Sequence, residues 1–486
     1  MHTGIPFTEI IFMAETYTEF RRRLDAGQTT CAETVNEALR GAEEKSSLNA
    51  FISLTAERAR QRAAEIDEQV KGGTAGPLAG MTLAIKDNIA MKDQGLTCGS
   101  RILDGFTSIY SATALERLEA AGAIVIGKTN MDEFAMGSSN ENSFFGPALH
   151  PLDDTRVPGG SSGGSGVAVA AGICHGALGS ETGGSVRQPA AFLGLVGVKP
   201  TYGRVSRYGL VAFASSLDQI SPFARSVDDA ALILETIAGA DEKDATSSSA
   251  AVEGYGGAIE ADAMRGMRIG IPAEYTVEGM HPAVTRALDE TRSRLSDAGA
   301  EIVEISLPHT EYTIPCYYVI ATAEASSNLA RFDGARYGYR SPNATTLEEM
   351  YEMSRSEGFG AEVKRRIMLG TFVLSSGYYD AYYRKAQQVR RLIHDDFARV
   401  FDRVDLILTP TTPTPAFKLG EKVNDPISMY LSDIFTAAVN LAGVPAISVP
   451  AGNDPETGLP IGVQFIARHF DEATMFKAAR WAEERS

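Results

Sequence analysis

One lysine and two serines stand out as side chains that could do chemistry. Lys86 lies 75 positions before Ser161, and Ser161 lies 24 positions before Ser185. A serine hydroxyl becomes a nucleophile only when a neighbouring base accepts its proton, and no histidine forms a motif near these serines. The residue types therefore indicate acyl chemistry by a serine that a lysine activates.

Lys86 must lose its own proton before it can serve as a base. A lysine with its ordinary pKa of about 10.4 is charged at neutral pH. The apolar residues 81–85 directly before it predict a buried strand. Because burial disfavours the charged form of an amine, we expect Lys86 to be buried at the end of this strand with a lowered pKa.

Ser161 lies in a run of glycine and serine, residues 159–166, whose composition is also typical of a flexible linker. The run leads straight into the apolar residues 167–172, which predict a buried helix. Linkers lead into polar surface instead. The context therefore favours a folded loop over a linker.

The residues just before Ser185 are suited to bind an oxyanion. Glycines let backbone N–H groups approach a substrate closely, and a helix N-terminus favours negative charge. We expect a helix over residues 185–193 and an oxyanion hole at Thr182, Gly183 and Gly184.

Residues 122–129 match the phosphate-loop pattern G-x-x-x-x-G-K-[ST]. In a phosphate loop a strand precedes the first glycine and a helix follows the lysine. Here Ile124, Val125 and Ile126 lie between the two glycines and themselves predict a strand. We therefore do not expect nucleotide binding at this motif.

The composition restricts the class of protein. With 486 residues, 44% hydrophobic and 22% charged, the chain is long enough for a large core. A net charge of −17 argues against a basic face for nucleic acid. No apolar stretch reaches the roughly 18 residues of a membrane span, so we expect no membrane and a cytoplasmic location. Four scattered cysteines indicate neither a zinc site nor a disulfide framework.

Alternating strand and helix patterns predict an α/β protein that forms one large domain over residues 1–486. We expect an N-terminal helical region at about 13–70, starting near Met13, and a signature core at about 76–230. A surface excursion at about 240–263 then precedes a C-terminal half at about 265–486.

The serine and lysine spacing, with the residues around it, resembles the amidase signature family. The resemblance implies a mixed central β-sheet covered by helices on both sides. It makes Ser185 the nucleophile, Ser161 the bridging serine held through a cis peptide bond, and Lys86 the base. Residues 131–142 resemble the family's active-site wall.

Residues 199–219, 323–334 and 374–383 resemble one branch of that family, the glutaminase (A) subunits of tRNA-dependent amidotransferases. The resemblance implies that Arg366 binds the α-carboxylate of glutamine and Asp433 its amine, with Tyr317 and Ser138 beside the substrate. The choice between Arg365 and Arg366 stays open. The resemblance implies no metal and no cofactor in this chain.

This branch implies a heterotrimer with B and C subunits. The B subunit uses ATP and magnesium and makes most contacts with tRNA. In this branch the A subunit releases ammonia from glutamine. The ammonia is used to convert Glu-tRNA(Gln) to Gln-tRNA(Gln), Asp-tRNA(Asn) to Asn-tRNA(Asn), or both. The alternative is a stand-alone amidase for another small amide, which would keep Lys86, Ser161 and Ser185 but lack the pair Arg366 and Asp433.

Overall fold

The computed structural model describes residues 15–257, 260, 262–276 and 279–485, so Met13 lies outside it. Within these residues, eleven strands form one sheet in the order β1-β3-β2-β4-β6-β5-β10-β11-β9-β7-β8. The strands are β1 (Phe51–Leu54), β2 (Thr82–Lys86), β3 (Ile124–Thr129), β4 (Gly176–Glu181), β5 (Val196–Lys199), β6 (Gln219–Ala224), β7 (Arg268–Pro272), β8 (Glu301–Ile305), β9 (Leu406–Pro410), β10 (Ala446–Asn453) and β11 (Pro460–Ala467).

The sheet is mixed. Parallel pairing joins β2 to β3 and β4 at one end and β7 to β8 and β9 at the other, while the strands between them pair antiparallel. Strands from both halves of the chain meet where β5 pairs with β10. Because one sheet joins the two halves, we propose that the whole chain is a single domain.

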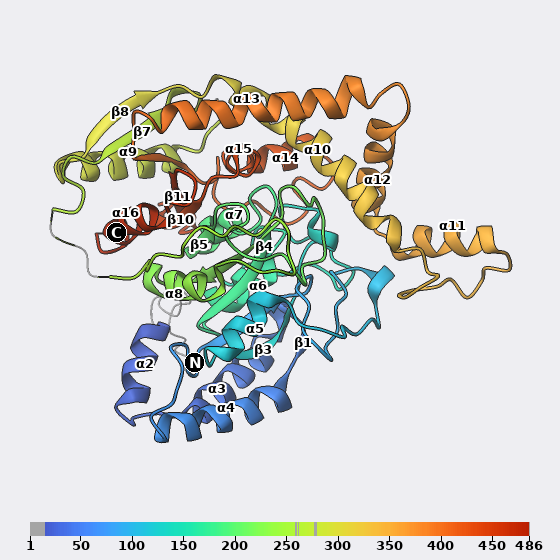
Figure 1. Ribbon diagram of the computed structural model, residues 1–486, viewed down its shortest axis with the longest axis horizontal. Helices are drawn as coiled ribbons and strands as arrows, with labels where there is room; N and C mark the ends of the chain where they lie inside the picture. Colours follow the sequence, from blue (N-terminus) through green and yellow to red (C-terminus); the bar gives the residue numbers. More distant parts are fainter. Residues whose placement is uncertain (1–14, 258–259, 261, 277–278, 486) are drawn as a thin grey trace.

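Helices surround this sheet in Figure 1. They are α2 (Tyr17–Asp25), α3 (Cys31–Glu44), α4 (Ala56–Lys71), α5 (Thr113–Ala120), α6 (Gly163–Ala170), α7 (Arg187–Leu193), α8 (Val227–Ile237), α9 (Pro282–Asp297), α10 (Thr313–Asn328), α11 (Leu347–Gly358), α12 (Ala361–Leu374), α13 (Lys385–Val400), α14 (Pro426–Tyr430), α15 (Ala437–Ala442) and α16 (Glu472–Glu483). None of the described helices is long and apolar enough to cross a membrane.

Side-chain alternation along β2 decides which face of the sheet carries the candidate chemistry. Leu83 and Ile85 belong to a core cluster shared with α8 and α16, whereas Ala84 belongs to a cluster with α6 and α7. Successive side chains of a strand point to opposite faces. Lys86 therefore lies on the face that α6 and α7 cover.

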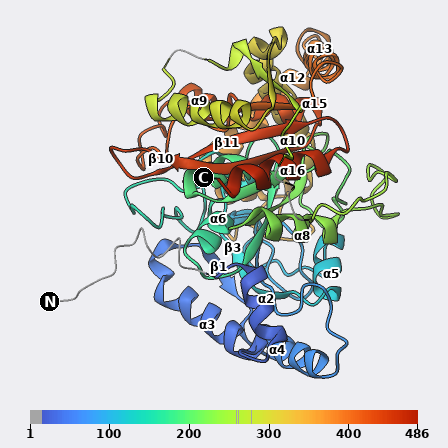
Figure 2. The same cartoon turned by 90° about the vertical axis from the view of Figure 1, so that its left-hand side faces the viewer.

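The molecule has two helical ends. Figures 1 and 2 agree in placing α2, α3 and α4 at one end and α13 at the other. Helices α11 and α12 extend to one side in Figure 1, away from the sheet. Helix α12 still packs along α10, since a side chain at Gly370 would collide with the carbonyl of Thr322.

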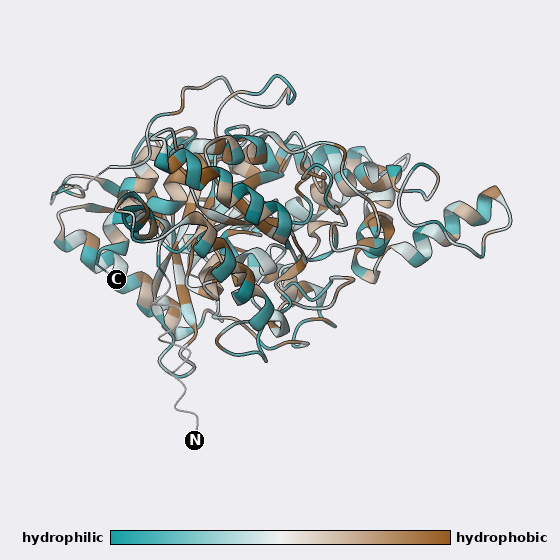
Figure 3. Cartoon of the chain, turned by 90° about the horizontal axis from the view of Figure 1, so that it is seen from below, coloured by the Kyte–Doolittle hydropathy of each residue, from teal (hydrophilic) through white to brown (hydrophobic). Residues whose placement is uncertain are grey.

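The outer helices are amphipathic. Figure 3 shows hydrophilic and hydrophobic residues interspersed along them on the face it presents. Helix α13 buries Ile393, Phe397 and Val400, which recur at the three-to-four-residue spacing of one helix face. This burial fixes the helix on the core and leaves its polar face to solvent.

Local sequence signals predicted several boundaries correctly. A capping box at Thr30 and Glu33 opens α3, within the helical region expected at about 13–70. The stretch 122–129 forms β3 rather than a phosphate loop, and Lys128 is buried with its Nζ 3.1 Å from Asp87 Oδ1. All four cysteines are free and buried. The described residues of the excursion at 240–263 contain no helix or strand.

Candidate active site

Lys86 is the last residue of β2 and is completely buried. Its Nζ lies 2.8 Å from Ser161 Oγ, 2.8 Å from Ser162 Oγ and 3.2 Å from the carbonyl oxygen of Ser180. The strand thus places the amine of Lys86 beside the loop of Ser161, which lies 75 residues later in the chain. The predicted contact between Lys86 and Ser161 is present.

The surroundings of Lys86 favour its neutral form. Burial lowers the pKa of Lys86 to about 7, although the negative charges of Asp132 and Asp218 act to raise it. The three groups within hydrogen-bond distance are two hydroxyls and a carbonyl, none of which carries charge. At neutral pH a sizeable fraction of Lys86 can therefore accept a proton.

Ser161 lies in the loop between the active-site wall (residues 131–142) and α6. The peptide bond between Gly160 and Ser161 is cis, as the family resemblance implied. The N–H of Asp132 donates to the carbonyl of Ser161 at 3.1 Å, and the N–H of Gly160 donates to Gln188 Oε1 at 3.0 Å. The loop is therefore held from two sides.

The glycines that follow Ser161 allow close packing. A Cβ atom at Gly163 would lie 2.6 Å from Asn140 Oδ1, and one at Gly164 would lie 2.5 Å from the carbonyl of Asn130. Neither distance leaves room for a side chain. This is why the run is a packed loop and helix start rather than a linker.

Ser185 lies between β4 and α7 and is 8% exposed. Its carbonyl accepts a 3.3 Å hydrogen bond from the N–H of Ser162, which joins the two serine loops. Among the described residues its hydroxyl forms no hydrogen bond with a protein group, and Ser161 Oγ lies within hydrogen-bond distance of Lys86 Nζ instead. A free hydroxyl at a nearly buried position is available to a substrate.

The helix predicted over residues 185–193 begins two residues later, at Arg187. Val186, the residue before the helix, has non-helical backbone angles of φ −123° and ψ −49°. The carboxylate of Glu181 accepts the N–H groups of Val186 at 3.2 Å and Arg187 at 3.0 Å. These two donors are thereby occupied. Ser185 is left in a turn before the helix.

Thr182, Gly183 and Gly184 form the turn expected to bind an oxyanion. In the part of the chain that the structure describes, none of their backbone N–H groups donates to a protein acceptor. Thr436 Oγ1 donates to the carbonyl of Gly183 at 2.7 Å. Since C=O and N–H point in opposite directions across a trans peptide, this contact turns the N–H of Gly184 away from Thr436.

Gly184 could not be replaced by another residue without a clash. Its φ of +152° lies in a region that side chains disfavour, and a Cβ atom would lie 2.3 Å from Thr436 Oγ1. At Gly183 a Cβ atom would lie 2.7 Å from the ring of Tyr317. Tyr317 and Thr436 therefore enclose the turn from two sides.

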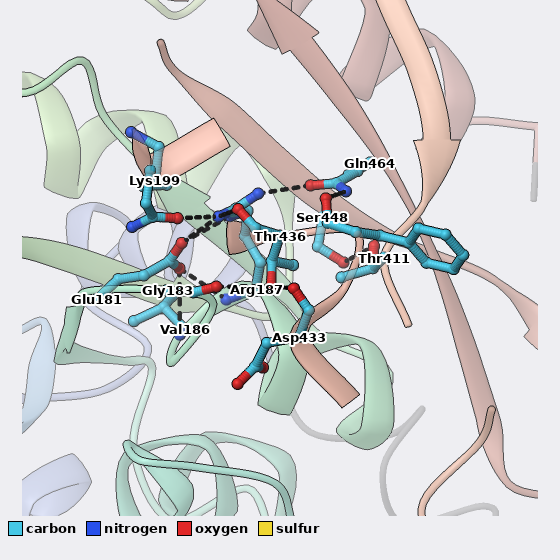
Figure 4. Close-up of polar contacts among 12 residues, drawn as sticks. Glu181, Gly183, Val186, Arg187, Lys199, Thr411, Asp433, Thr436, Ser448 and Gln464 are labelled. Carbon is cyan, nitrogen blue, oxygen red and sulfur yellow. Dashed lines mark hydrogen bonds and ion pairs between the residues drawn. The ribbon is translucent and has the colours of Figure 1, made fainter. Parts of the chain in front are cut away.

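A buried ion pair fixes the residues around Ser185 (Figure 4). Arg187 Nη2 lies 2.5 Å from Glu181 Oε1, and both side chains are fully buried. The guanidinium also donates to Gln464 Oε1 at 2.6 Å, on β11, and to Asn440 Oδ1 at 2.6 Å, on α15. The turn that carries Ser185 is thus tied to the second half of the chain.

Arg365 and Arg366, between which the sequence left the choice open, both lie on α12 but differ in burial. The side chain of Arg366 is 4% exposed and its Nε lies 2.8 Å from Glu362 Oε1, whereas that of Arg365 is 45% exposed. Burial alone would lower the pKa of Arg366, but Tyr318 and Glu362 raise it well above its ordinary value. Arg366 is the buried, charged candidate.

The guanidinium of Arg366 is oriented by its neighbours. It lies over the rings of Tyr318, Tyr430 and Phe213, with its carbon 5.3, 5.6 and 5.7 Å from the ring centroids. Within the described residues its two terminal nitrogens donate to no protein acceptor. Two parallel N–H donors of this kind match a carboxylate.

Asp433 lies in a short turn, η8 (Leu431–Asp433), and is 7% exposed. Ser138 Oγ donates to its Oδ2 at 2.5 Å, while its buried Oδ1 has no partner among the described residues. Burial raises the pKa of Asp433 to about 7, against the hydrogen bond from Ser138. An unpartnered buried oxygen is costly unless a ligand donates to it.

A pocket of 110 Å³ opens beside these residues. It is lined by Arg366 and Glu362 on α12, by the active-site wall at Gly137 and Ser139, and by Tyr430. Ser185 and Asp433 lie outside its lining. The pocket therefore reaches the arginine end of the candidate site.

Comparison with known proteins decides the family. A family model described as Amidase matches residues 33–476. The chain belongs to the amidase family. It is 59% identical over 441 residues to the A subunit of glutamyl-tRNA(Gln) amidotransferase of Koribacter versatilis, a match that covers 90% of this chain and 92% of that protein. The family resemblance, the α/β fold and the enzyme class expected from the sequence are confirmed.

Solved structures show the same fold. The crystal structure of the glutamyl-tRNA(Gln) amidotransferase A subunit from Thermotoga maritima matches with a TM-score of 0.77 at 42% identity, over 99% of this chain and 95% of that chain. The native peptide amidase from Stenotrophomonas maltophilia matches with a TM-score of 0.82 at 29% identity, over 99% and 98%. An amidotransferase subunit and a peptide amidase therefore share this architecture.

The sequence did not single out several residues of this amidase site. Ser162 is as close to Lys86 as Ser161 is, and adjacent serines in a loop give no signal to distinguish them. Thr436 and Glu362 contact their partners across the site without belonging to any motif. Asp218 accepts a 2.7 Å hydrogen bond from Thr182 Oγ1, and burial raises its pKa to about 6.

Proposed function

We propose that this chain is the glutaminase (A) subunit of a tRNA-dependent amidotransferase, which hydrolyses glutamine to supply ammonia. Relatives at 52–59% identity over most of the chain are named as A subunits of glutamyl-tRNA(Gln) amidotransferase. The substrate is inferred from two groups that lack a protein partner among the described residues. These are the terminal nitrogens of Arg366, whose side chain is 4% exposed, and the buried Oδ1 atom of Asp433.

Glutamine fits these groups because it is a zwitterion. Its α-carboxylate would take the two terminal nitrogens of Arg366, which Glu362 and three aromatic rings hold in place. Its α-ammonium would donate to Asp433, which Ser138 orients. Tyr317 would lie beside the side chain, over Gly183. A neutral amide satisfies neither charge, which disfavours the stand-alone amidase.

The reaction begins when Ser185 Oγ attacks the side-chain carbonyl carbon of glutamine. A C–O bond forms, and the proton of Ser185 passes through Ser161 to Lys86, 2.8 Å from Ser161 Oγ. The C–N bond then breaks after the nitrogen takes a proton back along the same path. Ammonia leaves, and water hydrolyses the glutamyl ester to glutamate.

The negative oxygen of the tetrahedral intermediate would be held by the backbone N–H groups of Thr182, Gly183 and Gly184. These donors have no other acceptor in the described structure. Thr436 and the pair of Glu181 and Arg187 hold the turn in place before the substrate arrives. Donors positioned in advance stabilise the charge without reorganising.

The names of these relatives imply a multi-subunit enzyme, and we propose a heterotrimer with B and C subunits in the cytoplasm. The B subunit would use ATP and magnesium to activate Glu-tRNA(Gln), Asp-tRNA(Asn) or both. The net charge of −17 is in keeping with tRNA contacts made mainly by that partner.

The test is ammonia release from glutamine by the chain purified with its B and C partners. We expect release that rises when ATP and Glu-tRNA(Gln) are added. Release from glutamine that does not respond to them would leave a glutaminase without coupling. No release from glutamine would favour a stand-alone amidase, to be screened with other amides.

A further inference from the structure

Glu133 is a buried carboxylate that the proposed mechanism does not use. It begins the short turn η3 (Glu133–Ala135) in the active-site wall and is 2% exposed. Its N–H donates to the carbonyl of Asn142 at 3.2 Å. A carboxylate at such a position needs donors from elsewhere in the fold.

The two oxygens of Glu133 join two distant segments. Ser100 Oγ donates to Oε1, and the N–H of Gly360 donates to Oε2 at 2.8 Å. Gly360 is the N-cap residue of α12 and has no side chain that could cap the helix itself. A Cβ atom there would lie 2.4 Å from Glu133 Oε2. Glu133 thus supplies the cap from 227 residues away.

The same short segment also touches the serine loop. Asp132, the preceding residue, donates its N–H to the carbonyl of Ser161, and its carboxylate accepts the N–H of Asn140 at 2.9 Å. Helix α12 carries Glu362 and Arg366, two and six residues after Gly360. Residues 132 and 133 therefore connect the bridging serine with the helix that holds the candidate carboxylate ligand.

Hydrogen bonds and burial act in opposite directions on the ionisation of Glu133. Burial raises the pKa of Glu133 to about 7, and the hydrogen bonds from Ser100 and Gly360 act to lower it. A negative charge at the first turn of a helix is stabilising. Glu133 shares a pocket of 350 Å³ with other charged side chains, which are Arg101, Glu141, Glu357 and Glu362, and Lys364 also acts on its charge.

We propose that Glu133 is a positioning residue that holds the N-terminus of α12 on the active-site wall and so sets where Arg366 meets the carboxylate of the substrate. The inference rests on the proposed glutaminase function. It assigns to Glu133 an effect on the affinity for glutamine rather than on the chemical step, because Glu133 acts through α12 and touches neither serine.

The test compares steady-state hydrolysis of glutamine by the complete enzyme carrying Glu133→Ala or Glu133→Gln. We expect Glu133→Ala to raise KM by about tenfold with kcat changed by less than about twofold, an effect of the size that a helix cap supplies. Glu133→Gln keeps the shape and one acceptor oxygen, so we expect a smaller rise in KM.

Glu349→Gln is the matched control, because Glu349 caps α11 through Thr345 and Thr346 and contacts no candidate substrate ligand. Its KM should equal that of the unaltered enzyme. An unchanged KM in both Glu133 variants, or a fall in kcat that matches the loss of folded protein, would overturn the proposal. An unaltered enzyme that releases no ammonia from glutamine would instead remove the proposed function itself.

If Glu133→Ala fails to fold, the proposal is tested by glutamine binding to the isosteric variant Glu133→Gln. Glutamine affinity is measured by calorimetry on Ser185→Ala with and without Glu133→Gln, so that no turnover interferes. Weaker binding in the double variant, at an unaltered melting temperature, supports the positioning role. Equal binding in the two proteins contradicts it.

Discussion

The serine loops surround the buried Lys86 and helix α12 buries Arg366, and the pKa values of these two cations shift in opposite directions. Lys86 contacts two hydroxyls and a carbonyl, and burial lowers its pKa to about 7. Arg366 is equally buried but pairs with Glu362, and its pKa is raised. Burial by itself therefore does not decide whether a cation becomes a base or stays charged. The charge of its nearest partner does.

The two regions also differ in how they are packed. A side chain at Gly163 or Gly164 would overlap neighbouring atoms, so the loop that carries Ser161 is tightly packed. Helix α12 exposes 67% of Met368 and 47% of Phe372 and is held by a few buried residues. A proton relay and a substrate ligand both need fixed positions, and α12 obtains its position from its buried residues and from the contact of Gly360 with Glu133. Substitutions in each region test this difference.

The largest effect is expected in the serine loops. Ser185→Ala and Lys86→Ala should each lower kcat for ammonia release by at least about 10⁴-fold, since the relay acts as a unit. Ser165→Ala is the control, because Ser165 Oγ contacts Thr129 Oγ1 and the carbonyl of Leu178 instead. Near-normal kcat in Ser185→Ala, with folding verified by circular dichroism, would remove it as the nucleophile.

A smaller effect, on affinity, is expected in α12. Arg366→Gln should raise KM for glutamine by about 10²-fold while kcat falls much less, because a buried charged contact with the substrate is lost. Arg365→Gln alters a neighbouring arginine that is 45% exposed and should leave KM within about twofold. Equal responses of the two variants in a kinetic titration would contradict the assignment of Arg366.

Lys86 and Asp433 should both make activity rise with pH. Lys86 must be neutral to accept a proton and Asp433 must be ionised to bind an ammonium, and both have pKa values of about 7. Each active form therefore gains population as pH increases through 7. We expect kcat/KM to fall at least about tenfold per unit below about pH 6. A profile flat between pH 5.5 and 8 would refute this reading of both groups.

The smallest effect is expected where the second half of the chain supports the oxyanion turn. Thr436→Val removes the hydroxyl that donates to the carbonyl of Gly183 at 2.7 Å and to that of Asp433 at 3.1 Å, and it keeps the shape of the side chain. We expect kcat to fall about fivefold to tenfold, as for the loss of one hydrogen bond, with KM unchanged. A change confined to KM would show that Thr436 supports substrate binding instead.

The sequence predicted those parts of the site that depend on local patterns. The apolar residues before Lys86 indicated a buried strand, and β2 ends at Lys86. The glycines before Ser185 indicated a turn with free N–H groups. The helix start was wrong by two residues, because Val186 has non-helical backbone angles and the side chain of Glu181 accepts the N–H groups of Val186 and Arg187. No periodicity in the sequence reports such a contact.

The sequence by itself determined the residue types, their spacing and the strand and helix that carry them, because alternation and helical periodicity are properties of neighbouring residues. Tertiary structure alone decided that Arg366 rather than Arg365 is buried, that Ser162 joins Ser161 at Lys86, and that Thr436 anchors Gly183 from 253 residues away. Those outcomes depend on which faces pack together. Packing between distant segments also sets the desolvation that lowers the pKa of Lys86.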